Sequence, residues 1–223
     1  DYHDYIEGAH VADLTGKTCL ILSAETILSR SVHDNLVASG ANVYMLDIPE
    51  ATEPAWDSAL LNSQQRPAKI DAIVNVSIPD SGGAVGDVAL PEFRRVIETS
   101  YIRTWLALKY GIQTLRSSGG GSFITITSVD GATGAPAAAA RCAASHGITL
   151  MTKSAALECA DKKDNVRVNA LLVGDIIPGE HEAYASGHVS PEDVAEAAAH
   201  LVSDAAVYIT GLIMPVDNGR VGY

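Results

Sequence analysis

The sequence predicts one α/β domain in which helices cover both faces of a doubly wound parallel sheet. Its 223 residues fit a single domain, and 47% of them are hydrophobic, which is enough for one sizeable core. Several apolar runs lack the alternation of a half-exposed strand, and segments with helical periodicity separate them. Buried strands that alternate with helices are typical of a parallel sheet. We therefore expect one domain over residues 1–223, with a short N-terminal extension at residues 1–13.

The first three predicted elements form a βαβ unit. An apolar run covers residues 18–22, a segment with a period of 3.6 residues covers 28–39, and a second apolar run covers 43–46. Gly40 and Ala41 separate the helix from the second strand. Two strands joined by one helix pair in parallel through a right-handed crossover, so this unit predicts the start of a parallel sheet.

Further apolar runs predict buried strands, and further periodic segments predict helices. The predicted strands are residues 72–76, 123–127 and 166–172, and the predicted helices are residues 91–117, 136–160 and 191–203. Gly, Asp or Asn bound these strands. The glycine-rich segment 117–122 is short enough to be a helix-to-strand turn, so we expect no linker between domains.

Composition and charge exclude several classes of function. Fifteen Lys and Arg against 27 Asp and Glu give a formal net charge of −12, which disfavours binding to the phosphate backbone of nucleic acids. No run of 18 or more apolar residues could span a bilayer, and the acidic N-terminal residues do not resemble a signal peptide. We expect a cytoplasmic protein that binds neither nucleic acid nor membrane.

The cysteines predict neither a disulfide nor a metal site. Cys19, Cys142 and Cys159 form no C-x-x-C pair and have no histidine at metal-ligand spacing. Cys142 and Cys159 fall in one predicted helix, about 25 Å apart at about 1.5 Å per residue, which is beyond the reach of a disulfide. We expect reduced thiols and no bound metal.

Six short motifs follow one another in an order that agrees with the predicted strands and helices. They are LTGK at 14–17, DAIVN at 71–75, ITSVDG at 126–131, TKSAALE at 152–158, VRVNA at 166–170, and ITG at 209–211 through VD at 216–217. In this order the chain resembles the short-chain dehydrogenase/reductase family over residues 14–219. The resemblance implies a Rossmann-like fold, an NAD(P) cofactor, and oxidation of alcohols or reduction of carbonyls.

The positions that the resemblance assigns to the cofactor are altered. The family carries three glycines in the first βα turn, where the backbone approaches the pyrophosphate at a helix N-terminus. Ser23, Ile27 and Ser29 stand at these positions, and the β-branched Ile27 resists a positive φ and fills space that the phosphates need. Two interpretations stay open, an ordinary packed loop and a reshaped dinucleotide site.

Three further cofactor positions complete this comparison. Asp47 stands where the family places the acid that binds the adenosine ribose, although an Asp before Ile48-Pro49 is also common for local reasons. Asn75 begins a motif whose last position, a glycine that faces the cofactor in the family, is Ile78. We therefore expect this chain to bind no cofactor.

The four catalytic positions of the family are altered even more clearly. The family transfers a proton with a Tyr, a Lys four residues later, a Ser and a helix Asn. Ser128 matches the serine, but Arg141 replaces the tyrosine, Ser145 the lysine and Ser100 the asparagine. An arginine stays protonated at neutral pH and cannot exchange a proton with an alcohol. His146, which is adjacent to the lysine position, points about 100° away from it on a helix, so we expect a solvated or interface histidine.

Two segments are shorter than the resemblance implies. Residues 48–70 leave too little room for the helix, further strand and loops that the family places there, and residues 175–190 are short for a substrate lid. Deletion and disorder are both compatible with these lengths.

The altered positions favour a chain that has kept the fold and lost the chemistry. The resemblance implies a catalytically inactive subunit that supports an active, paralogous alcohol or hydroxyacyl-CoA dehydrogenase in a hetero-oligomer, with NAD on the partner. Family members assemble as tetramers through helices that correspond to residues 91–117 and 136–160. Alanines at 137–140, 143–144 and 155–156 would let another helix approach closely, or they pack within the chain's own core.

Two other functions stay open. An active NAD(P)-dependent oxidoreductase with unconventional residues would need a rebuilt phosphate turn and a rebuilt proton relay. A ligand-binding sensor would use the vacated cleft, with Arg141 in contact with an anionic group of its ligand.

Overall fold

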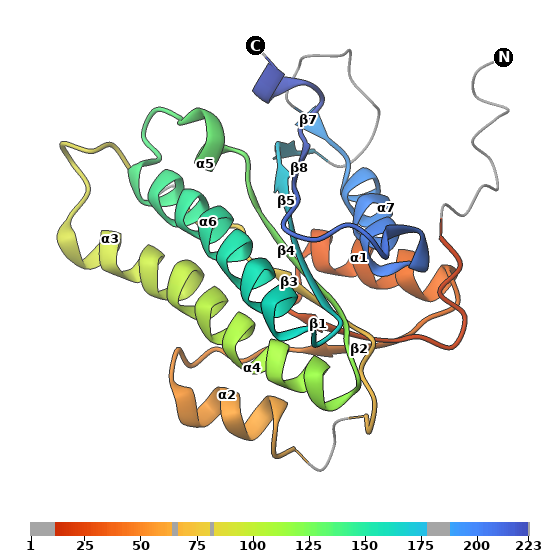
Figure 1. Ribbon diagram of the computed structural model, residues 1–223. Coiled ribbons are helices and arrows are strands. Elements are labelled where there is room, and N and C mark those ends of the chain that lie inside the picture. The colour runs from red at the N-terminus through yellow and green to blue at the C-terminus, as the bar shows by residue number, and fades with distance from the viewer. Residues whose placement is uncertain (1–11, 64–66, 81–82, 178–187, 223) are drawn as a thin grey trace, which may run out of the picture.

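A six-stranded parallel sheet forms the centre of the computed structural model, which describes residues 12–63, 67–80, 83–177 and 188–222 (Figure 1). Its strand order is β2–β1–β3–β4–β5–β8. The strands are β1 (Thr18–Leu22), β2 (Asn42–Leu46), β3 (Ala72–Val76), β4 (Gly121–Ser128), β5 (Val166–Val173) and β8 (Ile213–Val216). The predicted doubly wound, Rossmann-like α/β fold is confirmed.

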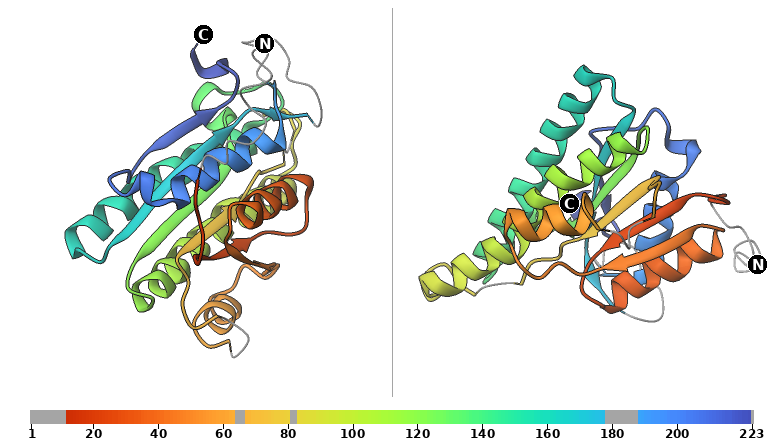
Figure 2. Two further views of the ribbon diagram at one scale, coloured as in Figure 1. Left: turned by 90° about the vertical axis from the view of Figure 1, so that its right-hand side faces the viewer. Right: turned by 90° about the horizontal axis from the view of Figure 1, so that it is seen from below.

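Helices cover both faces of this sheet and create two cores. The helices α1 (Ile27–Ala38) and α7 (Pro191–Val202) pack together on one face, which is turned toward the viewer in the left view of Figure 2. The other face carries α2 (Glu53–Leu60), α4 (Arg103–Ser117) and α6 (Ala139–Lys162). Strand side chains alternate between the two cores: Cys19 and Ile21 face α1 and α7, whereas Leu20 and Leu22 face α2 and α4.

The chain changes direction in the sheet at β1. Leu22 at the end of β1 lies opposite Leu46 of β2 on one side and opposite Asn75 of β3 on the other. The chain runs outward to β2, returns to β3 and then continues to the far edge at β8. In open α/β sheets, ligands bind at the carboxyl ends of the strands beside such a switch point. The fold therefore places any ligand site above the ends of β1, β3 and β4.

Strand β2 forms one edge of the sheet, because no strand in the described part of the chain pairs with its outer side. Among the described residues between β2 and β3, the chain forms only α2, which buries Trp56 and Leu60 against the core. Tyr44 and Met45 point to opposite faces of β2 and are 47% and 37% exposed. The short connection at 48–70 thus holds one helix, which the sequence analysis did not predict, and leaves the edge of the sheet uncovered.

Several predicted boundaries differ from the observed ones. The helix predicted at 136–160 begins at Ala139, because Ala137 adopts a positive φ of 53° that ends the preceding turn. The helix predicted at 91–117 is α3 (Leu90–Val96), a π-helical segment (Ile97–Ile102) and α4 in succession. A π-helical segment widens the helix locally, and such segments are frequent at functional sites.

Short elements surround the carboxyl end of the sheet. The helix α5 (Asp130–Thr133) follows β4, and β6 (Asp175–Ile176) pairs in parallel with β7 (His188–Val189). The remainder of the predicted short segment at 175–190, residues 178–187, and most of the predicted N-terminal extension, residues 1–11, lie outside the described residues.

The three cysteines are free, as the sequence predicts. Cys19 and Cys159 are buried, whereas Cys142 is half-buried on α6. Burial raises the pKa of the Cys19 thiol to about 12, so this side chain remains a protonated, unreactive thiol at neutral pH.

Candidate functional site

The four altered catalytic positions come together at the carboxyl end of β4. Ser128 is the last residue of β4, Arg141 and Ser145 lie on α6, and Ser100 lies in the π-helical segment that packs against α6. The fold therefore still assembles the place where the family carries out its chemistry. What the four side chains contact there differs from a proton relay.

Arg141 forms an ion pair instead of facing an open cleft. Its Nη1 lies 3.2 Å from Asp130 Oδ2, and the Asp130 side chain is only 3% exposed. The other carboxylate oxygen of Asp130 lies 2.8 Å from Nη2 of Arg220, near the C-terminus. Arg220 also contacts Asp175 at 3.4 Å. This Asp130 cluster, made of Arg141, Asp130, Arg220 and Asp175, connects α6, α5, β6 and the C-terminal segment.

Ser145 and Ser128 are held in local hydrogen bonds. Ser145 is fully buried and accepts a hydrogen bond from Thr127 at 3.2 Å, so the lysine position of the family now forms part of the packing between α6 and β4. The Ser128 hydroxyl accepts a hydrogen bond from the Asp130 backbone N–H at 3.2 Å. A side chain at Gly131 would clash with the backbone of Ser145 and His146, which shows how closely α5 packs on α6.

Ser100 contributes to the helix and not to a relay. Its hydroxyl donates to the carbonyl of Val96 in the preceding turn. The buried Asn75 donates to Thr104 at 3.2 Å, and Thr104 donates to Ser77 at 3.0 Å. These hydroxyl and amide groups satisfy one another between the end of β3 and the first turn of α4.

The first βα turn is closed by hydrogen bonds within the chain. Thr26 is the N-cap of α1: its side chain accepts from the Ser29 backbone N–H at 3.1 Å, and the Ser29 hydroxyl accepts from the Thr26 backbone N–H at 2.8 Å. This reciprocal capping box uses two of the amides that a helix N-terminus would offer to an anion. No residue from 23 to 29, all of which are described, has a positive φ. The turn is an ordinary helix start.

Ser23, Ile27 and Ile78 surround a cavity of about 430 Å³ that extends over β1, β2 and β3. Ile27 and Ile78 are exposed at its rim, and the Ser23 hydroxyl donates to the adjacent carbonyl of Ala24. Ser29 lies beneath the turn and is fully buried. The cavity reaches Ser100 but none of Ser128, Arg141 and Ser145, so it covers only one side of the switch point.

Asp47 pairs with a cation of its own chain. Its Oδ1 lies 3.0 Å from Nη2 of Arg103 at the start of α4. This ion pair supports the local interpretation of Asp47 as a strand-end residue. A ribose would have to compete with Arg103 for the Asp47 carboxylate. Arg103 Nε is buried and has no hydrogen-bond partner among the described residues.

His146 is exposed and contacts α5. Its Nδ1 lies 2.8 Å from the carbonyl oxygen of Gly131. Its exposure agrees with the expectation of a solvated or interface histidine. Its contact with Gly131 holds α5 on α6.

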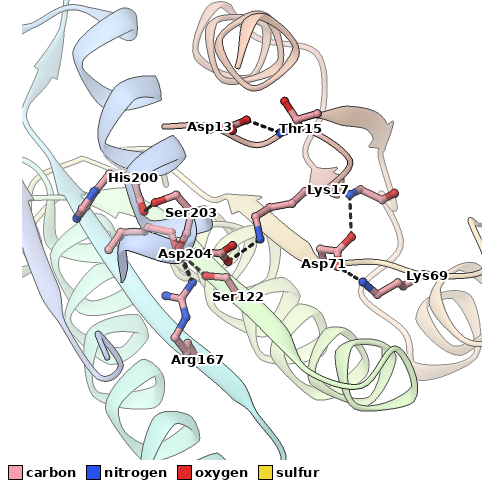
Figure 3. Close-up of polar contacts among 12 residues, drawn as sticks. Asp13, Thr15, Lys17, Lys69, Asp71, Ser122, Arg167, His200, Ser203 and Asp204 are labelled. Atoms are coloured by element: carbon pink, nitrogen blue, oxygen red, sulfur yellow. Dashed lines mark hydrogen bonds and ion pairs between the residues drawn. The ribbon is translucent and has the colours of Figure 1, made fainter. Parts of the chain in front are cut away.

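A second group of charges lies at the amino-terminal end of the strands, opposite the candidate site (Figure 3). Lys17 pairs with Asp204 at 2.7 Å, and Lys69 pairs with Asp71 at 2.5 Å. Burial favours a higher pKa for Asp71, but hydrogen bonds from Lys69 and the Thr18 backbone N–H outweigh it and lower the pKa. These contacts join β1 to the end of α7 and to β3, and they have a structural role.

Among the described residues, no group of three or more His, Cys, Asp or Glu side chains could hold a metal ion. In the same part of the chain, no helix is long and apolar enough to cross a membrane.

The residues present do not fit the chemistry that the resemblance implies. A dinucleotide needs free amides at the first helix, and Thr26 and Ser29 occupy them. A proton relay needs a group that titrates near neutrality, whereas Arg141 is permanently charged and Ser145 is buried. We therefore derive no reaction step through a nicotinamide cofactor on this chain.

Sequence analysis missed the residues that replace the relay. Asp130 is part of the ITSVDG motif, but the motif does not predict its ion pairs. Its partner Arg220 is 90 positions away in the sequence. The capping box was visible in principle, because Thr26 and Ser29 have the spacing of an N-cap and its N3 residue.

Comparisons with known proteins agree on the family. A family model described as enoyl-(acyl carrier protein) reductase matches residues 14–220. The 2,5-dichloro-2,5-cyclohexadiene-1,4-diol dehydrogenase of Sphingobium indicum is 28% identical over 248 positions, which cover 94% of this chain and 98% of that protein. This alignment is longer than the 223-residue chain, so that relative has internal segments with no counterpart here. The NADP-dependent (R)-specific alcohol dehydrogenase of Lentilactobacillus kefiri is 25% identical, with 92% and 97% covered.

Solved structures agree on the fold. Levodione reductase has a TM-score of 0.83 and 20% identity, covering 93% of this chain and 98% of that one. The 3-ketoacyl-(acyl-carrier-protein) reductase from Brucella melitensis, in complex with NADH, has a TM-score of 0.81 and 23% identity, with 93% and 99% covered. With a family model that spans nearly all of the described sheet and helices, the chain belongs to the short-chain dehydrogenase/reductase family.

Proposed function

We propose that this chain is a catalytically inactive subunit that supports an active paralogue of the same family in a hetero-oligomer. The observation that carries the proposal is the ion pair between Arg141 and the buried Asp130, at the position of the family's catalytic tyrosine. A guanidinium held in this way cannot donate a proton to a carbonyl or take one from an alcohol at neutral pH. The Asp130 cluster would then hold the former catalytic centre together as structure.

The altered cofactor turn supports the same proposal. With two helix amides capped by Thr26 and Ser29, the pyrophosphate of a dinucleotide would have to break both hydrogen bonds before it could bind. In the proposed complex, NAD binds to the partner, whose turn and relay are intact. All active sites then lie on the partner subunit.

Exposed apolar side chains on α4 and α6 offer a surface for this partner. Leu150 and Leu157 lie seven residues apart on one face of α6 and are 56% and 69% exposed, and Trp105 of α4 is 41% exposed. A cavity of about 430 Å³ lies between the two helices, beside Trp105. The alanines between residues 137 and 156 divide between two roles: Ala140, Ala144 and Ala156 of α6 pack inside the chain, whereas Ala143 of α6 and Ala137 before it are exposed.

The charge of the chain favours a different partner over a second copy of itself. A net charge of −12 opposes self-association at low ionic strength, although salt screens this repulsion. An intact paralogue with the same backbone and fewer acidic residues can replace one copy across a two-fold axis.

The proposal extends to a class of substrate. The combination of an inactive and an active family member resembles the heterotetrameric 2-[hydroxy(phenyl)methyl]succinyl-CoA dehydrogenase of anaerobic toluene degradation, which acts in benzylsuccinate β-oxidation. We include in the proposal that the partner oxidises a 3-hydroxyacyl-CoA.

The two alternatives have less support. An unconventional active oxidoreductase needs both a phosphate turn and a proton relay, and the residues at both places are engaged elsewhere. A sensor that binds an anion through Arg141 would have to displace Asp130 from that arginine.

Coexpression with an intact family member encoded beside this chain tests the proposal. We expect a homogeneous complex with equal amounts of the two chains, two of each, measured by size-exclusion chromatography with light scattering. The partner alone should be less soluble or less active than in the complex. A homotetramer of this chain that forms regardless of the coexpressed partner would contradict the proposal.

A further inference from the structure

We propose that a cavity at the amino-terminal end of the strands binds a small phosphate compound that carries at least two negative charges. This inference concerns a ligand and does not depend on the proposed supporting role. It rests on the position of the cavity, on the excess of positive charge in its lining, and on an arginine that is fixed in place without a carboxylate partner.

The cavity lies at the opposite end of the strands from the candidate functional site. Its volume is about 650 Å³, within the range of about 300–1,000 Å³ that is typical of small-molecule sites. The ends of α6 and α7 surround it, together with the turns that lead into β1, β3, β4 and β5. It shares no lining residue with the cavity over the carboxyl ends of β1, β2 and β3, so the two cavities are separate.

The lining of this cavity is positively charged, although the chain as a whole is acidic. Four cations and two carboxylates line it: Lys17, Lys69, Lys163, Arg167, Asp71 and Asp204. The two carboxylates are already paired, Asp204 with Lys17 at 2.7 Å and Asp71 with Lys69 at 2.5 Å. Lys163 and Arg167 form no ion pair with any described residue. Salt screens charges more than about 8 Å apart, so these local cations outweigh the net charge of −12.

Arg167 is a half-buried cation that backbone carbonyls hold in place. Its Nη2 donates to the carbonyl of Leu201 at 2.8 Å, and its Nη1 donates to the carbonyl of Ile209 at 3.3 Å. Lys17 and Arg167 both point toward Asp204 (Figure 3), but this carboxylate is paired with Lys17. Burial lowers the pKa of Arg167, and the charge of Asp204 opposes this effect only in part. A partly desolvated cation without a paired carboxylate favours the binding of an anion.

The neutral donors of the lining favour a phosphate over a carboxylate. Thr210 Oγ1 accepts from the Val168 backbone N–H at 3.1 Å, and its own hydroxyl hydrogen has no partner among the described residues. The side-chain amide of Asn165 also makes no hydrogen bond with them. These donors and the two unpaired cations come from the connection between α6 and β5, from β5 and from the segment before β8. Each phosphate group presents three oxygens in different directions, whereas a carboxylate presents two oxygens in one plane.

Titration calorimetry with inorganic pyrophosphate tests this inference, at fixed ionic strength and without divalent cations. We expect saturable binding with a Kd below about 1 mM. Citrate, a tricarboxylate, should bind at least about tenfold more weakly. The inference is overturned if pyrophosphate shows no saturable binding up to about 10 mM, or if citrate binds as tightly as pyrophosphate or more tightly.

A pair of lysine variants tests whether the cavity is the site. Lys163→Gln removes one unpaired cation from the lining and should weaken pyrophosphate at least about fivefold. Lys162→Gln is the matched control, because Lys162 is the preceding residue, is also exposed and does not line the cavity. Both variants change the net charge by one, so a difference between their Kd values has a local cause.

A second pair tests the location without removing a cation. Val207 lines the cavity and is 57% exposed, so Val207→Glu adds a carboxylate to the lining without changing the core and should weaken pyrophosphate at least about fivefold. Tyr208→Glu adds the same charge at the next residue, which is 97% exposed and outside the lining, and should change the Kd by less than about twofold. The inference is overturned if either cavity variant, folded like the unmodified chain, binds pyrophosphate as its control does.

Discussion

Arg141 Nη1 lies 3.2 Å from Asp130 Oδ2, so a buried carboxylate neutralises this permanent cation. The same carboxylate lies 2.8 Å from Nη2 of Arg220, which holds the C-terminal segment against α5. A buried charge tolerates the loss of its partner poorly. We therefore expect the Asp130 cluster to contribute to the free energy of unfolding.

Removing the shared carboxylate should destabilise the protein. In Asp130→Asn, two arginines that are about a quarter exposed lose their common partner, and we expect the free energy of unfolding to fall by about 2 kcal/mol. Asp175→Asn is the matched control, because the Asp175 side chain is 60% exposed and its contact with Arg220 is 3.4 Å long, and it should cost less than about 0.5 kcal/mol. Urea unfolding measures both variants. Equal free energies of unfolding for Asp130→Asn and Asp175→Asn would show that the Asp130 cluster has no structural role.

The capping box of α1 should contribute measurably to stability. Thr26→Ala removes the acceptor for the Ser29 backbone N–H, and we expect a loss of about 1 kcal/mol in the free energy of unfolding. Thr52→Ala serves as control, since Thr52 is the N-cap of α2 but makes no side-chain hydrogen bond there. Its effect should stay within about 0.5 kcal/mol. If the two variants unfold alike, the closed turn is not held by its cap.

The chain by itself should not bind a dinucleotide. The amides that would bind the pyrophosphate are capped by Thr26 and Ser29. The Asp47 carboxylate, which would bind the ribose, is paired with Arg103. Calorimetry with NAD or NADP should show no saturable binding tighter than about 0.1 mM, which corresponds to about 5.5 kcal/mol. The intact coexpressed partner provides the positive control. Tighter binding to this chain would mean that the turn opens on contact with the cofactor.

Restoring the two key catalytic residues should not restore activity. The double variant Arg141→Tyr with Ser145→Lys supplies a phenol and an amine, but no hydride donor or acceptor is bound beside them. We also expect a loss of about 2 kcal/mol in the free energy of unfolding, since a lysine must fit where α5 and α6 are in close contact.

Absorbance at the NADH band, with a 3-hydroxyacyl-CoA substrate, measures any turnover by this variant. The control is Arg141→Phe with Ser145→Lys, which has the same bulk and no hydroxyl. Turnover that appears with tyrosine and not with phenylalanine would reveal a working cofactor cleft, against the proposed function.

The exposed face of α6 should carry the contact with the partner. Leu157→Asp places a charge at a 69% exposed apolar position and should weaken the coexpressed complex at least tenfold, or about 1.4 kcal/mol. Val85→Asp is the control, because Val85 is 82% exposed but belongs to the turn before α3 and to neither α4 nor α6. Light scattering after size-exclusion chromatography measures how much of the complex each variant forms. A complex that survives Leu157→Asp unchanged would place the contact elsewhere.

The sequence by itself determined the strands and the permanent charge of Arg141. The strands at 18–22 and 72–76 lie where the apolar runs predict them, because a strand buried on both faces needs a continuous apolar run. The permanent charge of Arg141 is likewise a property of the residue alone, since a guanidinium stays charged in any surroundings.

Only the tertiary structure decided which contacts the altered residues make. Asp130 and Arg220 are 90 positions apart, and nothing local in either motif indicates that they meet. The uncovered edge at Tyr44 and the cavity beside Arg103 also depend on which elements are absent or adjacent after folding. Periodicity and side-chain chemistry act over a few neighbouring residues, whereas ion pairs and cavities depend on segments brought together by the whole sheet.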